Sequence, residues 1–138
     1  MATPASAAPG CRQWRVGQYF RAVQSNGYTV TFQLVQDDRG RLTGRAFYQA
    51  SRGKVVYGRA TGGVGERNIQ MQVTWENWAV GNYYGAAFGT KPSGGYLWAN
   101  IRGNNFPEGG GDSASWYTNH GTGESKPLSC PPADVIAG

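Results

Sequence analysis

Large aromatic side chains are the residues of this sequence whose types and spacing best fit a chemical role. They gather in the C-terminal half, where Trp75 and Trp78 flank a Glu-Asn dipeptide and two further tryptophans follow. Aromatic rings beside amide groups suit the binding of a sugar ring or a flat heterocycle. The ligand-binding candidates are therefore four tryptophans, one amide and one tyrosine: Trp75, Trp78, Trp98, Trp116, Asn100 and Tyr48.

Around Trp98, the aromatic and amide side chains share one face of the chain. Trp98 and Asn100 alternate with Leu97, Ala99 and Ile101, so in a strand the two sets point to opposite sides. A ring and an amide on one face could contact a ligand together without disturbing the aliphatic core. The alternative is that the tryptophans only fill the interior of the domain, and the sequence leaves it open.

Side chains for acid–base or metal chemistry are sparse. The single histidine, His120, lies in a polar stretch typical of a turn, and the adjacent acids Asp37 and Asp38 lie at an expected hairpin tip. The sequence shows no cluster of Cys, His and carboxylates for a metal and no nucleotide-binding motif. We therefore predict a binding protein without catalytic residues, metal or cofactor. An enzyme that uses preorganised shape alone is the less favoured alternative.

The basic charge is spread along the chain. The formal net charge is +5, and it comes mostly from ten arginines that form no dense run. This spacing disfavours specific nucleic-acid binding. Attraction to acidic surfaces such as anionic glycans is enough to account for the charge.

The two cysteines, Cys11 and Cys130, bracket the strand-rich part of the chain. Because the ends of a compact domain often lie close together, we predict a disulfide between them. Such a link would stabilise the fold by about 4–5 kcal/mol on the loop-entropy model. Two unrelated free thiols are the alternative.

Export from the cytoplasm is indicated by two features. A disulfide implies an oxidising compartment, and residues 1–10 are small, uncharged and Pro-containing, like the start of a mature exported protein. No apolar stretch approaches the length of about 18 residues that a membrane span needs. We expect a secreted or periplasmic protein.

Short strands, in which apolar and polar residues alternate, must position the aromatic and amide side chains proposed to bind a ligand. Hairpin signals such as Ser25-Asn-Gly27 join them and favour antiparallel neighbours. Eight such strands usually close into a barrel, which removes the exposed edges. The strands are predicted over 13–23, 28–36, 41–49, 53–60, 67–75, 80–89, 95–102 and 113–119.

The expected architecture is an all-β, eight-stranded antiparallel up-and-down β-barrel over residues 13–120. A flexible N-terminal segment over 1–12 precedes it, and a C-terminal tail over 121–138 is stapled to it by Cys130. A two-sheet sandwich would use the same turn signals and is the alternative. Short connectors favour the barrel, because none is long enough to suggest a Greek-key crossover.

Six short stretches resemble the avidin and streptavidin family, within the calycin group of ligand-binding barrels. They occur in the family's order and span most of the chain: Gly17-Gln-Tyr-Phe20, Asn26-Gly-Tyr-Thr-Val-Thr-Phe32, Arg41-Leu-Thr-Gly44, Val73-Thr-Trp-Glu-Asn77, Tyr96-Leu-Trp98 and Ser115-Trp-Tyr117. The resemblance implies a barrel whose mouth holds a ligand between Trp75 or Trp78, Trp98 and Trp116. It also implies biotin as a ligand, and barrels of this family commonly assemble into dimers or tetramers, so a homo-oligomer stays open.

The polar half of a biotin site is not recognisable in this sequence. Arg21 stands where the family has an asparagine, Ala46 or Phe47 stands near the tyrosine position, and no aspartate lies near His120. The resemblance therefore supports the scaffold more than the ligand.

The favoured function is a secreted, non-catalytic barrel that binds a small molecule or glycan through an aromatic-lined mouth. The alternative is an extracellular protein-binding module, such as a protease inhibitor, acting through loops expected at Thr90-Lys-Pro-Ser-Gly-Gly95 and Asn104-Asn-Phe-Pro-Glu-Gly109.

Overall fold

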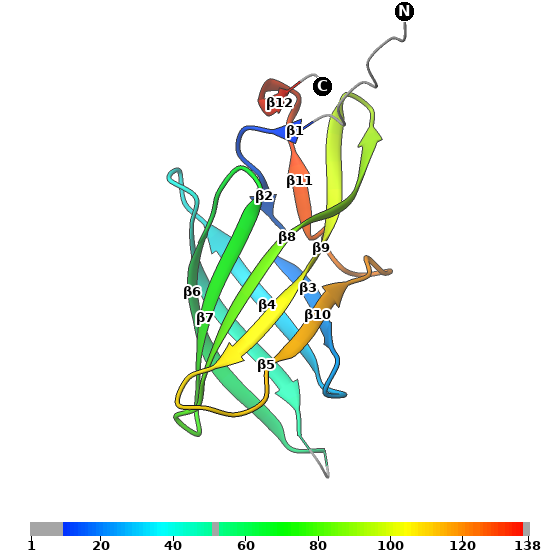
Figure 1. The fold of residues 1–138 in the computed structure, drawn as a ribbon. Helices are drawn as coiled ribbons and strands as arrows, with labels where there is room; N and C mark the ends of the chain where they lie inside the picture. Colours follow the sequence, from blue (N-terminus) through cyan, green and yellow to red (C-terminus); the bar gives the residue numbers. More distant parts are fainter. Residues whose placement is uncertain (1–9, 51–52, 137–138) are drawn as a thin grey trace, which may run out of the picture.

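Eight antiparallel strands close into a barrel in the computed structural model, which describes residues 10–50 and 53–136 (Figure 1). Each barrel strand pairs with the next along the chain, and the last, β10, pairs with both β9 and β3. The predicted up-and-down barrel is confirmed, and the two-sheet alternative is wrong. The barrel strands are β3 (Tyr19–Gln24), β4 (Thr29–Gln36), β5 (Arg41–Gln49), β6 (Val55–Val64), β7 (Asn68–Trp75), β8 (Val80–Ser93), β9 (Tyr96–Pro107) and β10 (Ala114–Thr118).

Alternation along each strand places apolar side chains inside the barrel. In β7 every second residue from Ile69 to Trp75 is buried, and the residues between them are exposed. Aromatic rings fill the middle of the interior: Phe32 lies 5.4 Å from both Phe20 and Tyr83, measured between ring centroids. The interior is therefore a packed core rather than an open channel.

The N- and C-terminal segments close one end of the barrel. Strand β2 (Arg15–Val16) pairs with β11 (Leu128–Cys130), which also pairs with β9. The side-chain amide of Gln13 donates to the Val64 carbonyl, and that of Gln36 donates to the carbonyl of the buried Trp14. Beyond this layer, β1 (Gly10–Cys11) pairs with β12 (Val135–Ile136), which follows a short 3-10 turn over Pro132–Asp134.

The predicted disulfide joins Cys11 to Cys130 at this closed end. Both cysteines are buried, and the described part of the chain contains no free cysteine. Of the segment predicted to be flexible, residues 1–9 lie outside the described residues. The C-terminal segment adds strands β11 and β12 to the structure.

One predicted strand is interrupted, and three others, β6, β8 and β9, run further than predicted. The predicted strand 13–23 is interrupted at Gly17, because the chain there leaves the barrel ladder and donates its backbone N–H to the carbonyl of Pro127. Strand β8 runs past a bulge between Phe88 and Lys91 and forms with β9 a hairpin that extends beyond the barrel (Figure 1). At its other end, β9 continues to Pro107 and pairs with the start of β8, and β6 continues to Val64 rather than ending at residue 60. The expected loops at 90–95 and 104–109 are therefore mainly strand.

Within the described residues, we find no helix with the length and apolar character needed to cross a membrane.

Candidate functional site

A cavity of about 210 Å³ opens at the end of the barrel opposite the disulfide. It lies among the turns that follow β3 and β7 and the strand ends beside them. In the part of the chain that the structure describes, no charged side chain and no histidine lines it. The lining residues are Gln24, Asn26, Tyr28, Val30, Tyr48, Trp75, Ala79, Val80, Gly81, Tyr83, Asn105 and Pro107.

Four aromatic rings form the wall and floor of this mouth cavity. The edge of one ring meets the face of the next: Tyr48 lies 4.8 Å from Trp75 and 5.2 Å from Tyr28 between centroids. Below them Tyr83 is almost fully buried and contacts Trp116, which lies one layer deeper. Edge-to-face packing fixes the orientation of each ring, so the cavity has a defined aromatic surface.

Three side-chain amides form a hydrogen-bonded chain along the opposite wall. The amide nitrogen of Asn105 donates to Gln24, and the Gln24 amide nitrogen donates to Asn26. The Asn26 oxygen also accepts the backbone N–H of Tyr28. The chain holds all three amides in place beside the rings.

The carboxamide oxygen of Asn105 has no hydrogen-bond donor among the described residues, although it is buried. A buried acceptor without a partner costs about 1–3 kcal/mol. This oxygen lies in the wall of the cavity, beside Gly81. The wall of the cavity therefore contains one buried acceptor that has no partner within the described chain.

Two tyrosine hydroxyls in the cavity are held in the neutral form. Burial raises the pKa of Tyr83 well above its ordinary value, and the neighbouring Tyr48 adds to the rise. Burial also raises the pKa of Tyr48, with smaller contributions from Tyr28 and Glu76. At neutral pH both phenols therefore remain hydrogen-bond donors and acceptors without charge.

Trp78 stands at the tip of the β7–β8 turn, outside the mouth cavity. Its side chain is 85% exposed, and its φ of 69° lies in the left-handed region. It lines a shallow groove on the outer wall together with Tyr57 and Arg59. The structure thus places this candidate at the rim of the mouth end rather than in the lining of the mouth cavity.

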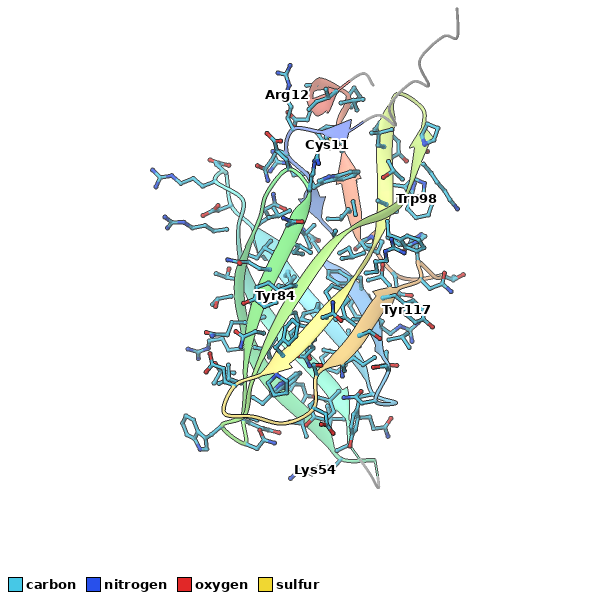
Figure 2. The ribbon with its side chains drawn as sticks, viewed as in Figure 1. Cys11, Arg12, Lys54, Tyr84, Trp98 and Tyr117 are labelled. Atoms are coloured by element: carbon cyan, nitrogen blue, oxygen red, sulfur yellow. A yellow bond between two sulfur atoms is a disulfide. The ribbon has the colours of Figure 1, made fainter. Side chains whose placement is uncertain are left out.

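Trp98 and Asn100 lie on the outside of the barrel wall, as Figure 2 shows for Trp98. The Trp98 ring packs edge-on against His120, and the ammonium groups of Lys91 and Lys126 lie 5.2 and 5.3 Å from its centroid. The oxygen of Asn100 accepts from the Thr118 hydroxyl and the His120 backbone N–H. These contacts tie the segment after β10 to β9.

The structure therefore brings only part of the candidate set together. Tyr48 and Trp75 line the mouth cavity, and Trp116 supports its floor through Tyr83. Trp78 lies at the rim, and Trp98 and Asn100 belong to a separate cluster on the outer wall. The residues that sequence analysis missed are Gln24, Asn26, Tyr28, Tyr83 and Asn105.

One signal in the sequence could have found Asn105. The inward positions of β9 alternate from Leu97 through Ala99 and Ile101, and two more steps of the same period reach Asn105. The sequence predicts a loop over residues 104–109, which includes Asn105, so the predicted strand ends before this position.

No protein-family model, no curated protein and no solved structure matches this chain. Its closed barrel of eight antiparallel strands is compatible with a calycin-like fold.

Proposed function

We propose that the protein is a secreted, non-catalytic barrel that binds one small, uncharged ring compound, such as a sugar residue or a flat heterocycle, in the mouth cavity. The observation that carries this proposal is the buried Asn105 oxygen, which lacks a donor in the wall of an aromatic cavity. A ligand O–H or N–H pointing at this oxygen would remove the cost of the unpaired acceptor.

The shape and polarity of the cavity support a single ring. A volume of about 210 Å³ is below the range of roughly 300–1,000 Å³ typical of sites for drug-sized ligands. The edge and face of Trp75 and Tyr48 offer apolar contact to a ring, while Gln24 and Asn105 offer amide groups. A charged ligand would lose its hydration without gaining an opposite charge from the described lining.

A binding role is supported by where the ionisable side chains lie. His120 packs against Trp98 on the outer wall, away from the mouth cavity. Glu76 lies in the turn that carries Trp78 and does not line the cavity. The buried disulfide supports export to an oxidising compartment, either outside the cell or in the periplasm.

A native mass spectrum of the unreduced protein tests the proposal. We would record the protein as purified and then with biotin methyl ester, which is uncharged, N-acetylglucosamine and adenine. The expected result is a 1:1 complex with at least one uncharged ring compound, either retained or newly formed. A protein that carries no small molecule and binds none of these compounds would contradict the proposal.

Two neighbouring asparagines provide a matched pair of variants for this measurement. Asn105→Ala removes the unpaired oxygen and should weaken the complex at least tenfold. Asn104→Ala changes the next residue, which is exposed on the outer wall, and should leave the complex unchanged. Equal loss of binding in both variants would place the ligand elsewhere.

A further inference from the structure

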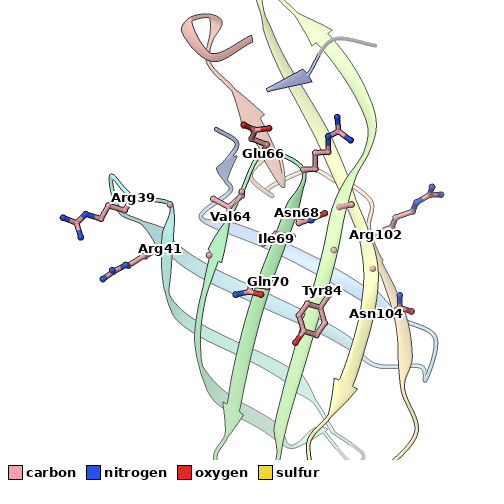
Figure 3. A pocket seen from close by; sticks show the side chains of 17 residues that line it. Arg39, Arg41, Val64, Glu66, Asn68, Ile69, Gln70, Tyr84, Arg102 and Asn104 are labelled. Carbon is pink, nitrogen blue, oxygen red and sulfur yellow. The ribbon is translucent and has the colours of Figure 1, made fainter. Parts of the chain in front are cut away.

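A groove about 860 Å³ in volume lies on the outer barrel wall (Figure 3). It crosses the strands from β5 to β9 and includes the turns between β4 and β5 and between β6 and β7. These elements lie toward the closed end, so the groove is separate from the mouth cavity. No residue lines both.

Strand register explains why the wall is hollow here. One row of paired residues runs across five strands: Arg41, Gly63, Gln70, Tyr84 and Asn104. At about 4.8 Å between strands, this row is roughly 19 Å long. Gly63 contributes no side chain to it, and a Cβ built there would have only the Gly40 carbonyl within 4 Å, at 3.7 Å. The groove is therefore a row of polar side chains with a gap in it.

A second row next to the first has the same character. Asn68 pairs with Ala86, which pairs with Arg102. The small side chain of Ala86 leaves space between the two larger ones. Together the rows form a long, shallow floor of amides with one exposed ring, that of Tyr84, which is 49% exposed.

Four arginines line this groove against one acidic residue, Glu66. In Figure 3, Arg39 and Arg41 flank one side and Arg102 flanks the other. All four arginine side chains are exposed, and the salt bridge found among the described residues, between Arg21 and Glu124, involves none of them. The nearby carboxylate of Asp37 accepts the backbone N–H groups of Arg39 and Arg41. The groove thus carries a local excess of positive charge.

We propose that this groove binds an anionic polysaccharide whose sugar units carry carboxylates. Guanidinium groups match carboxylates in planar, paired hydrogen bonds. The amides of Gln70, Asn68 and Asn104 suit sugar hydroxyls, and the Tyr84 ring offers a surface for the apolar face of a sugar. The length of the row fits a chain of several units better than a single small anion.

Two other occupants fit the groove less well. Single-stranded nucleic acid binds through several stacked aromatic rings, whereas Tyr84 is the one aromatic residue among the described lining residues. A second copy of this chain placed groove to groove would bring two positive surfaces together.

Calorimetric titration with oligogalacturonate tests the proposal, with neutral dextran oligosaccharide and a single-stranded DNA oligonucleotide as comparison ligands. We expect oligogalacturonate to bind, more weakly as salt rises, and to bind more tightly than either comparison ligand. Equal binding of dextran, or tighter binding of DNA, would overturn the assignment.

Matched variants locate the binding surface. Arg41→Gln with Arg67→Gln removes two charges from the groove and should weaken oligogalacturonate binding at least tenfold. Arg12→Gln with Arg59→Gln removes two charges elsewhere and should weaken it less than threefold. Equal weakening by the two pairs would show attraction to net charge alone and overturn the proposal.

A third variant changes shape without changing charge. Gly63→Gln fills the gap in the row and should weaken binding at least fivefold, while the midpoint of thermal unfolding stays within a few degrees of the parent. If the arginine variants unfold at a lower temperature than the parent, the binding of oligogalacturonate by Gly63→Gln alone tests the proposal. Unchanged binding by a folded Gly63→Gln protein would overturn the proposal.

Discussion

Trp78 occupies a backbone conformation that favours glycine. Its φ of 69° closes the turn in which its N–H donates to the Trp75 carbonyl, and Ala79 continues into β8. For a residue with a Cβ, this region costs about 1–2 kcal/mol. Because the ring is 85% exposed, little packing within the described chain offsets that cost. The turn therefore carries a strain that is not offset by packing, at a residue whose large ring lies in solvent at the rim of the mouth end.

Replacing Trp78 by glycine should consequently stabilise the fold. We expect Trp78→Gly to raise the free energy of unfolding by about 0.5–1 kcal/mol, since relief of strain exceeds the added chain entropy of glycine. Urea denaturation measures the change. Trp78→Ala keeps the Cβ and the strain, so its stability should stay close to that of the parent. A glycine variant less stable than the alanine variant would contradict this explanation.

The raised pKa of Tyr83 predicts how stability depends on pH. The folded protein keeps the phenol protonated at a pH where the unfolded chain, with a pKa near 10.0, releases the proton. The stabilising contribution is therefore complete below pH 10 and is lost as the pH rises above it.

Thermal unfolding between pH 8 and pH 11 checks this expectation in a comparison with Tyr83→Phe. The midpoint of the parent should fall more steeply above pH 10 than that of the variant, which has no phenol to ionise at this position. Tyr57→Phe changes an exposed tyrosine and should follow the parent. Parallel curves for the parent and Tyr83→Phe would exclude the proposed effect.

At the scale of single residues, sequence periodicity predicted which face of a strand each side chain occupies better than it predicted which residues line the mouth cavity. Trp98 and Asn100 were correctly placed on the face opposite Leu97 and Ile101. In a closed barrel, that same face points away from the interior, so these two residues could not line a cavity inside it. The local sequence predicts which side chains share a face, whereas closure of the whole sheet determines whether that face points into the barrel or away from it.

At Gly85, strand β8 passes close to interior side chains of the neighbouring strands β9 and β10. A Cβ added there would lie 2.6 Å from a methyl carbon of Ile101 and 2.9 Å from the ring of Trp116. We expect Gly85→Ala to lower the free energy of unfolding by about 1–3 kcal/mol through overpacking. Urea denaturation against Gly63→Ala, where the nearest atom is 3.7 Å away, provides the comparison. Equal stability of the two variants would contradict the close approach.

Most strands were predictable because each is a local pattern. The strand predicted over 41–49 has those bounds in the structure, and β7 lies within one residue of its prediction. The extension of β8 along β9 past the bulge was not predictable from local signals, since Lys91, Pro92 and Gly94 are typical of a loop. Pairing between the two strands and with β11 keeps this segment extended.

The two ends of the barrel have different structures. One is sealed by Trp14, β2 and β11, and the other holds a cavity with an unpaired acceptor. The stability of the sealed end should depend on the disulfide, which joins residues 119 positions apart. On the loop-entropy model, a link of this span stabilises the folded chain by about 5 kcal/mol.

Removal of the disulfide should therefore lower stability without changing the mouth cavity. We expect Cys11→Ala with Cys130→Ala to lose about 5 kcal/mol of unfolding free energy in urea. The folded fraction of the variant should bind the mouth ligand as the parent does. A loss below about 1 kcal/mol would show that β2 and β11 hold this end without the covalent link.

The same link determines how the molecule responds to tension. Cys11 precedes every barrel strand, and Cys130 follows all of them. Force applied between the two ends of the chain would therefore pass through the sulfur–sulfur bond and bypass the barrel. Stretching would first extend the segments outside the two cysteines and separate β1 from β12. The barrel strands would bear load only after reduction, so a reducing agent would convert a mechanically shielded domain into one that unfolds under pull.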